Sequence, residues 1–209
     1  MRWLRSVRWG RRFPDCVGRV DILDASVSSM MIMVSSEERE RIRGSLLGLA
    51  VGDALGTTVE FQSRDSYPPV YDMTGGGVFR LEPGQWTDDT SMALCIATSL
   101  VETGGYDPVD QLRRFVRWRR DGYLSSTGRC FDIGNQTAWS LEDFEATGRP
   151  YRDDDGGRSA GNGSLMRLAP VAMAFCDDVE TAGRLCADSS RTTHPAVECV
   201  EACGAYGRL

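Results

Sequence analysis

The sequence contains no lysine: all 24 of its basic residues are arginine. This absence removes lysine Schiff-base chemistry and any phosphate loop that depends on a lysine. There is also a single histidine, His194, so a multi-histidine zinc site is excluded. Any bound metal must therefore be held mainly by oxygen, which favours magnesium, manganese or calcium.

Long apolar runs and a basic excess are lacking as well. No run reaches the roughly 18 residues that a membrane span needs, and the formal net charge of −6 argues against broad nucleic-acid binding. We therefore expect a cytoplasmic protein with no membrane partner. The seven cysteines include no C-x-x-C pair and fall mostly in apolar helical patterns. We interpret them as reduced core residues.

Residues 1–34 differ in composition from the rest of the chain. Six arginines fall within the first nineteen residues, interleaved with Trp3, Trp9 and Phe13. A targeting peptide is one interpretation, but the segment lacks the continuous apolar core of a secretory signal. We expect an unstructured extension over 1–34 and a domain over 35–209.

Helical signals dominate the chain from Ser35 onward. A serine cap followed by Glu37 and Glu38 predicts a helix start, and strand-like alternation is nearly absent. Glycine recurs every four residues in this first helix, at Gly44, Gly48, Gly52 and Gly56. Glycine destabilises a helix, so a stripe of four glycines indicates that another element or a ligand approaches the helix backbone closely. The sequence does not decide between these two alternatives.

Further helices are predicted by caps and breakers. Two begin after the caps Asp107 and Asp178, and another runs over 137–147 and ends at Gly148. The last helix starts at Pro195, with Val197 and Val200 facing inward. Pro170 should bend or break the apolar segment 164–175. The predicted fold class is all-α, with several short helices joined by glycine-rich loops.

An acidic segment, Thr87-Asp88-Asp89, precedes the apolar helix predicted from Met92 to Val101. These residues suit a helix N-terminus, which needs no further chemistry. Two carboxylates about 4 Å apart repel by roughly 1 kcal/mol in water, but by about 4 kcal/mol at a protein-like effective dielectric. In a cleft a cation or a proton must therefore enter, and the sequence leaves both interpretations open.

Four motifs in order resemble the ADP-ribosylglycohydrolase family, including its dinitrogenase-reductase-activating type. They are GSLLGLAVGDALGTTVEF (44–61), GQWTDDTSMAL (84–94), GNGSLMRLAP (161–170) and Thr193-His194. The resemblance covers about residues 38–209. It implies an all-α hydrolase with two Mg²⁺ or Mn²⁺ ions in a central cleft. Its substrate would be an ADP-ribosylated protein or a small ADP-ribosyl compound.

The resemblance also assigns candidate site residues. Thr87, Asp88 and Asp89 match metal ligands; Glu60, Asp88 and Asp89 are the candidate catalytic acids; Asn162, Gly163, Ser164 and His194 match segments that hold ADP-ribose. We add Asp53, beside the glycine stripe, and Ser126 and Gly128, in a second Gly/Ser loop, as candidate substrate-binding residues. Which carboxylate acts as acid or as base stays open.

One departure from the family pattern affects these expectations. No D-x-D-T segment, which supplies further metal ligands in the family, follows His194, and residues 153–155 are expected to be an exposed acidic loop. We therefore expect a chain truncated at its C-terminus, with part of the metal cage missing. Two alternatives remain: an inactive, crystallin-like binding or structural relative, and a metal-dependent phosphoester hydrolase.

Overall fold

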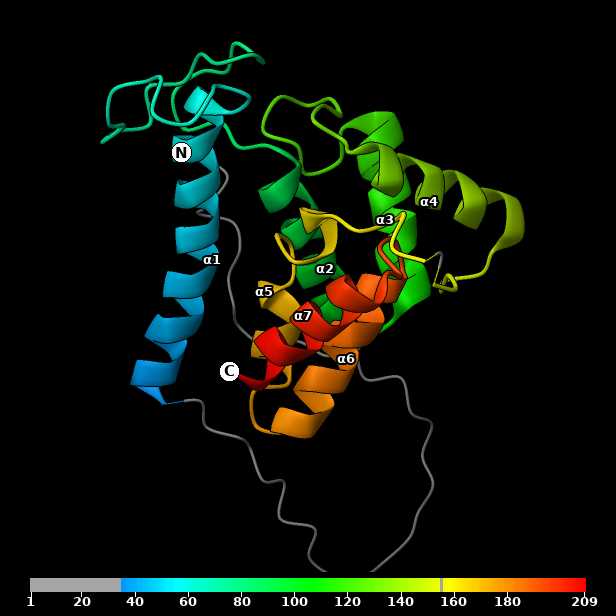
Figure 1. Cartoon of the computed structure of the whole chain (residues 1–209). Coiled ribbons are helices and arrows are strands. Elements are labelled where there is room, and N and C mark those ends of the chain that lie inside the picture. The colour runs from blue at the N-terminus through cyan, green and yellow to red at the C-terminus, as the bar shows by residue number, and fades with distance from the viewer. Residues whose placement is uncertain (1–34, 155) are drawn as a thin grey trace, which may run out of the picture. The chain divides into compact units, whose positions relative to one another are not determined.

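The computed structural model describes residues 35–154 and 156–209, so the extension expected over 1–34 lies outside the described residues. The described elements are α1 (Ser36–Gly56), η2 (Thr57–Val59), α2 (Asp88–Thr103), α3 (Pro108–Asp121), α4 (Asn135–Thr147), η3 (Asn162–Ser164), α5 (Ala169–Ala174), α6 (Val179–Arg191) and α7 (Val197–Arg208) (Figure 1). No strand occurs in these ranges beyond one isolated bridge between Gly76 and Leu81. The all-α prediction is confirmed. None of the helices in the described ranges is long and apolar enough to cross a membrane.

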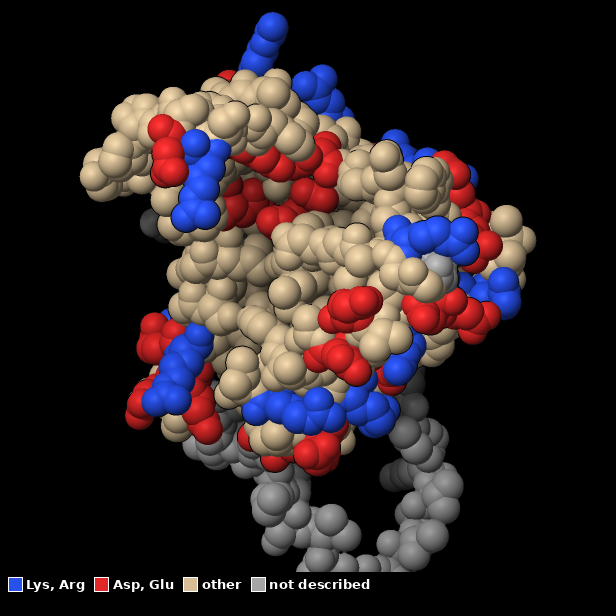
Figure 2. Space-filling view, in the orientation of Figure 1, with Lys and Arg blue, Asp and Glu red and all other residues tan. Residues whose placement is uncertain are grey.

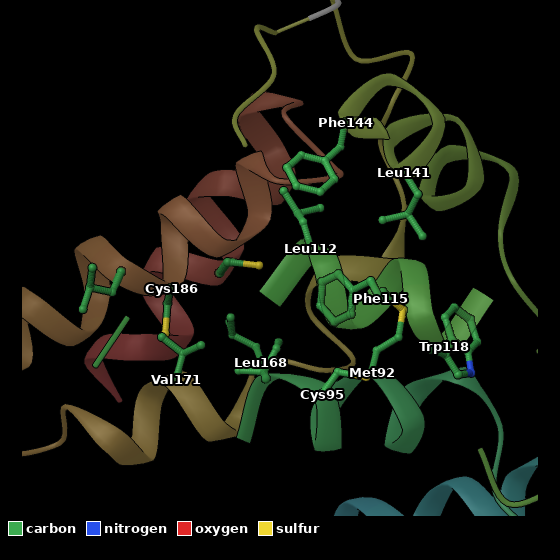
Figure 3. Packing of buried hydrophobic residues seen from close by; sticks show 13 residues of the cluster. Met92, Cys95, Leu112, Phe115, Trp118, Leu141, Phe144, Leu168, Val171 and Cys186 are labelled. Carbon is green, nitrogen blue, oxygen red and sulfur yellow. The ribbon is translucent and has the colours of Figure 1, made fainter. Parts of the chain in front are cut away.

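The core is built around α2. Helices α3 and α5 pack against it, and α6 packs against α5 and α7. Buried side chains from these helices and α4 meet in one cluster: Met92, Cys95, Ile96, Leu112, Phe115, Trp118, Leu141, Phe144, Leu168, Val171, Leu185, Cys186 and Cys203 (Figure 3). Four free cysteines are buried, as expected, whereas Cys130 is half-buried and Cys176 is exposed. The core thus fixes the N-terminus of α2, where the acidic segment begins.

Local signals place most helix ends correctly. Ser35 and Glu38 form a reciprocal capping box at the start of α1. Asp107 caps α3 by accepting from the backbone N–H groups of Val109 and Asp110. Gly148 ends α4 in the left-handed conformation that favours glycine. These ends were predictable because each depends on residues only a few positions apart.

The segment 164–175 is broken, as predicted, but the break lies ahead of Pro170. Helix α5 starts at Ala169 and keeps Pro170 in its first turn, where a missing N–H costs nothing. The last helix starts at Val197 rather than at Pro195, because Ala196 is held before it by a hydrogen bond from its N–H to Ser159 Oγ. The prediction that Val197 faces inward is wrong: it is 50% exposed, and Cys199 and Cys203 form the buried face.

The glycine stripe of α1 is open. A Cβ atom added at Gly44, Gly48, Gly52 or Gly56 would meet no other atom within 4 Å. Close packing against another element therefore does not account for the stripe within the described residues. Gly52 and Gly56, at the C-terminal end of α1, instead line a cavity.

Candidate active site

A cavity of about 690 Å³ lies where the C-terminal end of α1 meets the N-terminus of α2. Figure 2 shows acidic side chains gathered in a hollow at this place. Of the residues predicted from the sequence, the structure brings eight to the cavity: Asp53, Glu60, Thr87, Asp88, Asp89, Asn162, Gly163 and His194. Ser126, Gly128 and Ser164 do not line it. Segments far apart in the sequence thus converge on one site.

Asp53 ties α1 to α2. Its carboxylate accepts hydrogen bonds from the backbone N–H groups of Thr87, at 3.0 Å, and Thr90, at 3.1 Å. It also accepts from the two threonine hydroxyls, at 2.8 and 2.7 Å. Thr87 itself supplies no side-chain cap, so the cap of α2 comes from another helix. Asp53 therefore fixes where Asp88 and Asp89 enter the cavity.

Asp88 and Asp89 occupy the first turn of α2. Asp88 is only 8% exposed. Burial, followed by the charges of Asp132 and Asp89, raises the pKa of Asp88 to about 8. Burial, followed by the charges of Asp53 and Glu60, raises the pKa of Asp89 to about 6. At neutral pH, without a cation, Asp88 therefore holds a proton for much of the time.

Asp132 is a member of the site that sequence reasoning missed. It lies in the loop before α4, lines the cavity and has a positive φ of 59°. Burial, followed by the charge of Glu60, raises the pKa of Asp132 to about 7, and burial raises that of Glu60 as well. Each of these two carboxyl groups influences the pKa of the other, so they titrate as a pair. The available signal was an acid within the Gly/Ser loop that otherwise suggested anion binding.

Two residues predicted from that loop have other contacts. The Ser126 hydroxyl donates to the carbonyl oxygen of Trp86 at 2.6 Å, which fastens the loop just before the acidic segment. The Gly128 backbone packs so closely on Gly122 that a Cβ at Gly122 would lie 2.1 Å from the Gly128 oxygen. Neither residue lines the cavity, so both contacts are structural.

Five carboxylates line the cavity, from Asp53, Glu60, Asp88, Asp89 and Asp132. Burial and mutual repulsion raise the pKa values of Glu60, Asp88, Asp89 and Asp132, and a divalent cation would relieve that repulsion. The all-oxygen donor set suits Mg²⁺ or Mn²⁺. Within residues 35–154 and 156–209, however, no three Asp, Glu, His or Cys side chains are grouped closely enough to hold a metal ion. The residues fit a metal in chemistry and charge, and a closed shell would need further donors.

Stability is expected to fall as the pH rises from about 6.5 to about 8 when divalent cations are absent. The folded-state pKa values of Asp88 and Asp132 are raised from 3.8 to about 8 and about 7, so the folded state keeps protons that the unfolded state has released. The stability that these two raised pKa values contribute to the folded state is fully present below pH 3.8. It is lost as the pH rises through the folded-state pKa values of Asp132 and Asp88. The lowered pKa of His194 has the opposite effect, because it makes stability rise with pH. That rise is complete above the ordinary histidine pKa of 6.5, so it does not alter the loss expected at higher pH.

Urea denaturation in EDTA across this pH range measures the effect. We expect a loss of about 1–2 kcal/mol, from the linkage slope for one retained proton. The variant Asp88→Asn should flatten the profile, whereas Asp177→Asn, on an exposed residue, should not. A flat wild-type profile would show that these carboxyl groups do not repel one another as the geometry implies.

Another part of the cavity lining is formed by the loop at Gly161–Gly163 and by His194. The imidazole is 4% exposed and lies against the glycines: a Cβ at Gly163 would come within 2.6 Å of His194 Cε1 and 3.2 Å of Thr137 Oγ1. Burial and the charge of Arg167 lower the pKa of His194 to about 4, so the ring is neutral at neutral pH. Ser164 turns inward, where its hydroxyl lies 2.8 Å from that of Ser190.

Gly163→Ala is expected to displace this loop and to weaken ligand binding about tenfold or more, since the added Cβ has no room. Gly48→Ala is the matched control, because its Cβ would project into open space from a helix and should stabilise the protein by about 0.5–1 kcal/mol. Calorimetric titration with ADP-ribose, the ligand that the sequence motifs predict, and thermal melts measure both effects. Equal affinity in Gly163→Ala and the wild type would show that the loop does not contact the ligand.

Residues 35–209 match the family model of the ADP-ribosylglycohydrolases. The chain is 46% identical over 164 residues to the ADP-ribosylarginine hydrolase Tri1 of Pseudomonas putida (strain GB-1), covering 78% of this chain and 44% of that protein. It is 35% identical over 184 residues to the ADP-ribosyl-[dinitrogen reductase] glycohydrolase of Rhodospirillum rubrum, covering 85% and 59%. A solved structure titled ADP-ribosylglycohydrolase-related protein complex superposes with a TM-score of 0.71 at 44% identity, covering 83% of this chain and 56% of that one.

The match shows the class of protein to which this fold and this cavity belong, the all-α glycohydrolases. This chain belongs to the ADP-ribosylglycohydrolase family. It spans about half the length of the curated relatives it matches. The family resemblance predicted from the four motifs is therefore confirmed.

Proposed function

We propose that the acidic cavity is the ADP-ribosyl hydrolase site, or a large part of it, of a metal-dependent enzyme that cuts the bond between ADP-ribose and an acceptor. The observation that carries the proposal is the convergence of five carboxylates, a glycine loop and a neutral histidine on one cavity. Family membership supplies the substrate class. Arginine is the acceptor we favour, because the relatives of 46% and 44% identity are named ADP-ribosylarginine hydrolases.

Two Mg²⁺ or Mn²⁺ ions fit the donor chemistry of the acidic side of the cavity. The Thr87 hydroxyl and the carboxylates of Asp88 and Asp89 would supply donors, with Glu60 and Asp132 close by. When bound, such ions orient ribose hydroxyls and acidify water. Because these donors do not surround an ion by themselves, we infer that the remaining ligands come from outside this cluster.

The chain's own residues supply binding and proton transfer. The Gly161–Gly163 loop would approach the diphosphate closely, since glycines leave its backbone uncovered. Cleavage at the anomeric carbon passes through an oxocarbenium-like state, which nearby carboxylates stabilise by charge. Asp88, Asp89 and Asp132 are candidates for general acid–base work because their carboxyl groups line the cavity beside the place where the ligand would bind. Glu60, which also lines the cavity, completes the set of candidate acids.

Product analysis tests the proposal. The chain is incubated with ADP-ribosylated arginine and separately with a simple phosphodiester, each with Mg²⁺ or with EDTA. We expect Mg²⁺-dependent release of intact ADP-ribose and free arginine, and no phosphodiester cleavage. Release of AMP or cleavage of the phosphodiester would identify a phosphoester hydrolase instead. Binding of ADP-ribose without any turnover would identify a binding protein.

A further inference from the structure

Arg167 is a fully buried arginine in the motif that follows the glycine loop. Its guanidinium lies over the ring of Phe115, 4.6 Å from the ring centroid. It donates to the hydroxyls of Thr192 at 3.1 Å and Thr193 at 2.8 Å. No ion pair joins it to a carboxylate within the described ranges. Burying a charged group without a carboxylate partner costs folding free energy. The hydrogen bonds that Arg167 makes therefore suggest a role beyond packing.

The hydroxyl of Thr193 connects this arginine to His194. Its Oγ1 lies 2.8 Å from Nδ1 of His194. Arginine cannot accept a hydrogen bond, so Oγ1 is the acceptor toward Arg167 and keeps its own proton for another partner. Thr193 is fully buried, and Nδ1 is the acceptor within reach. Thr193 therefore donates to Nδ1, and the proton of the neutral imidazole must sit on Nε2.

Nε2 lies beside Gly161 and Gly163, two glycines that line the cavity with His194. His194 lines the cavity, and a Cβ at Gly163 would lie 3.0 Å from Nε2. No hydrogen bond from a described residue occupies Nε2, in contrast to Nδ1. The Nε2–H group is thus a fixed donor aimed into the space beside the glycine loop.

We propose that Arg167 and Thr193 are positioning residues: Arg167 orients the Thr193 hydroxyl, which holds His194 in the tautomer that offers Nε2–H to an oxygen acceptor of the ligand. The identity of that ligand, an ADP-ribosyl group, rests on the proposed function. The tautomer itself does not. In this account His194 binds as a neutral hydrogen-bond donor, and the carboxylates that line the same cavity carry the proton transfers.

Nitrogen NMR of the imidazole tests the relay directly. The chain has a single histidine, so ¹⁵N-histidine labelling gives one ring pattern without assignment. At pH 7.5 we expect a protonated Nε2 and an unprotonated Nδ1 in the wild type. Thr193→Val removes the donor to Nδ1 and should yield a mixture of tautomers or the Nδ1–H form. Arg167→Met should loosen the preference as well, with thermal melts to verify that the core survives.

Thr192→Val is the matched control. Thr192 is a buried neighbour that also accepts from Arg167, but its hydroxyl donates to the Ser189 carbonyl instead of to the imidazole. It should keep the wild-type pattern, and Thr193→Ser, which retains the hydroxyl, should restore it. A wild-type ring protonated on Nδ1, or an unchanged pattern in Thr193→Val, would overturn the proposal.

Calorimetric titration with ADP-ribose separates this inference from the proposed function. Thr193→Val should bind about tenfold more weakly, the scale of one lost hydrogen bond, and Thr192→Val should bind as the wild type does. If the tautomer is fixed but wild-type protein does not bind ADP-ribose, the proposed function fails and the relay stands. If ADP-ribose binds but Thr193→Val and Thr192→Val weaken it equally, the positioning role is refuted.

Discussion

Replacing Asp88 or Asp89 by asparagine is expected to lower ADP-ribose release from ADP-ribosylated arginine by at least about a hundredfold, the scale of losing one preorganised electrostatic group. Both side chains enter the cavity from the first turn of α2. Asparagine keeps the volume and an oxygen, but it removes the charge that would hold a divalent cation. Rates at saturating substrate and Mg²⁺ measure the effect, with Asp177→Asn, on an exposed residue, as the control.

The fold should survive both substitutions. The cap of α2 comes from Asp53, so neither Asp88 nor Asp89 is needed to hold the helix end. Removing one of several mutually repelling carboxylates should leave stability unchanged or increase it slightly at pH 8. Far-UV circular dichroism and melts should match the wild type. Full activity in both variants would show that the acidic cluster is not the reaction centre.

Asp53→Ala is expected to destabilise the protein by about 2–4 kcal/mol, because four buried donors on Thr87 and Thr90 lose one charged acceptor. Asp107→Ala provides a comparison, because Asp107 is the N-cap residue of α3 itself and accepts hydrogen bonds from two backbone N–H groups of that helix. Its loss should cost only about 1 kcal/mol. Urea denaturation measures both. Equal losses would mean that Asp53 acts as an ordinary cap and does not join α1 to α2.

Asp53→Ala should also remove activity, for a reason that differs from Asp88→Asn. Without Asp53 the start of α2 is free to shift, and the carboxylates that follow it lose their common orientation. Activity should therefore fall together with stability in Asp53→Ala, and alone in Asp88→Asn. Parallel measurement of the rate and the unfolding free energy separates these two outcomes.

Signals of short range predicted the fold well. The boundaries near Ser35, Asp107 and Gly148 depend on caps and on backbone conformation within a few residues. The start of α7 differs from the prediction because the contact that holds Ala196 ahead of the helix comes from Ser159, far back in the chain. The spacing of the glycines in α1 also could not show whether another element packs against them. In the structure none lies within 4 Å of a Cβ added at these positions.

The candidate site was predictable as a set of motifs but not as a geometry. The four motifs named Glu60, Asp88, Asp89 and His194, and all four line the cavity. Asp132 lay unremarked in a Gly/Ser loop, because only folding brings that loop to the acids. Ser164 was grouped with its neighbours Asn162 and Gly163, although a 3₁₀ turn points its hydroxyl into the interior. Side-chain direction within a short turn is a tertiary property.

The central claim is that the acidic cavity holds a divalent cation beside the ADP-ribosyl group. Calorimetric titration of Mn²⁺ into the chain, with and without ADP-ribose, tests it most directly. Because the cluster does not enclose an ion alone, we expect weak binding, on the order of millimolar, that ADP-ribose strengthens and that Asp88→Asn and Asp89→Asn abolish. Unchanged Mn²⁺ binding in both variants, or no binding by the wild type even with ADP-ribose, would contradict the account.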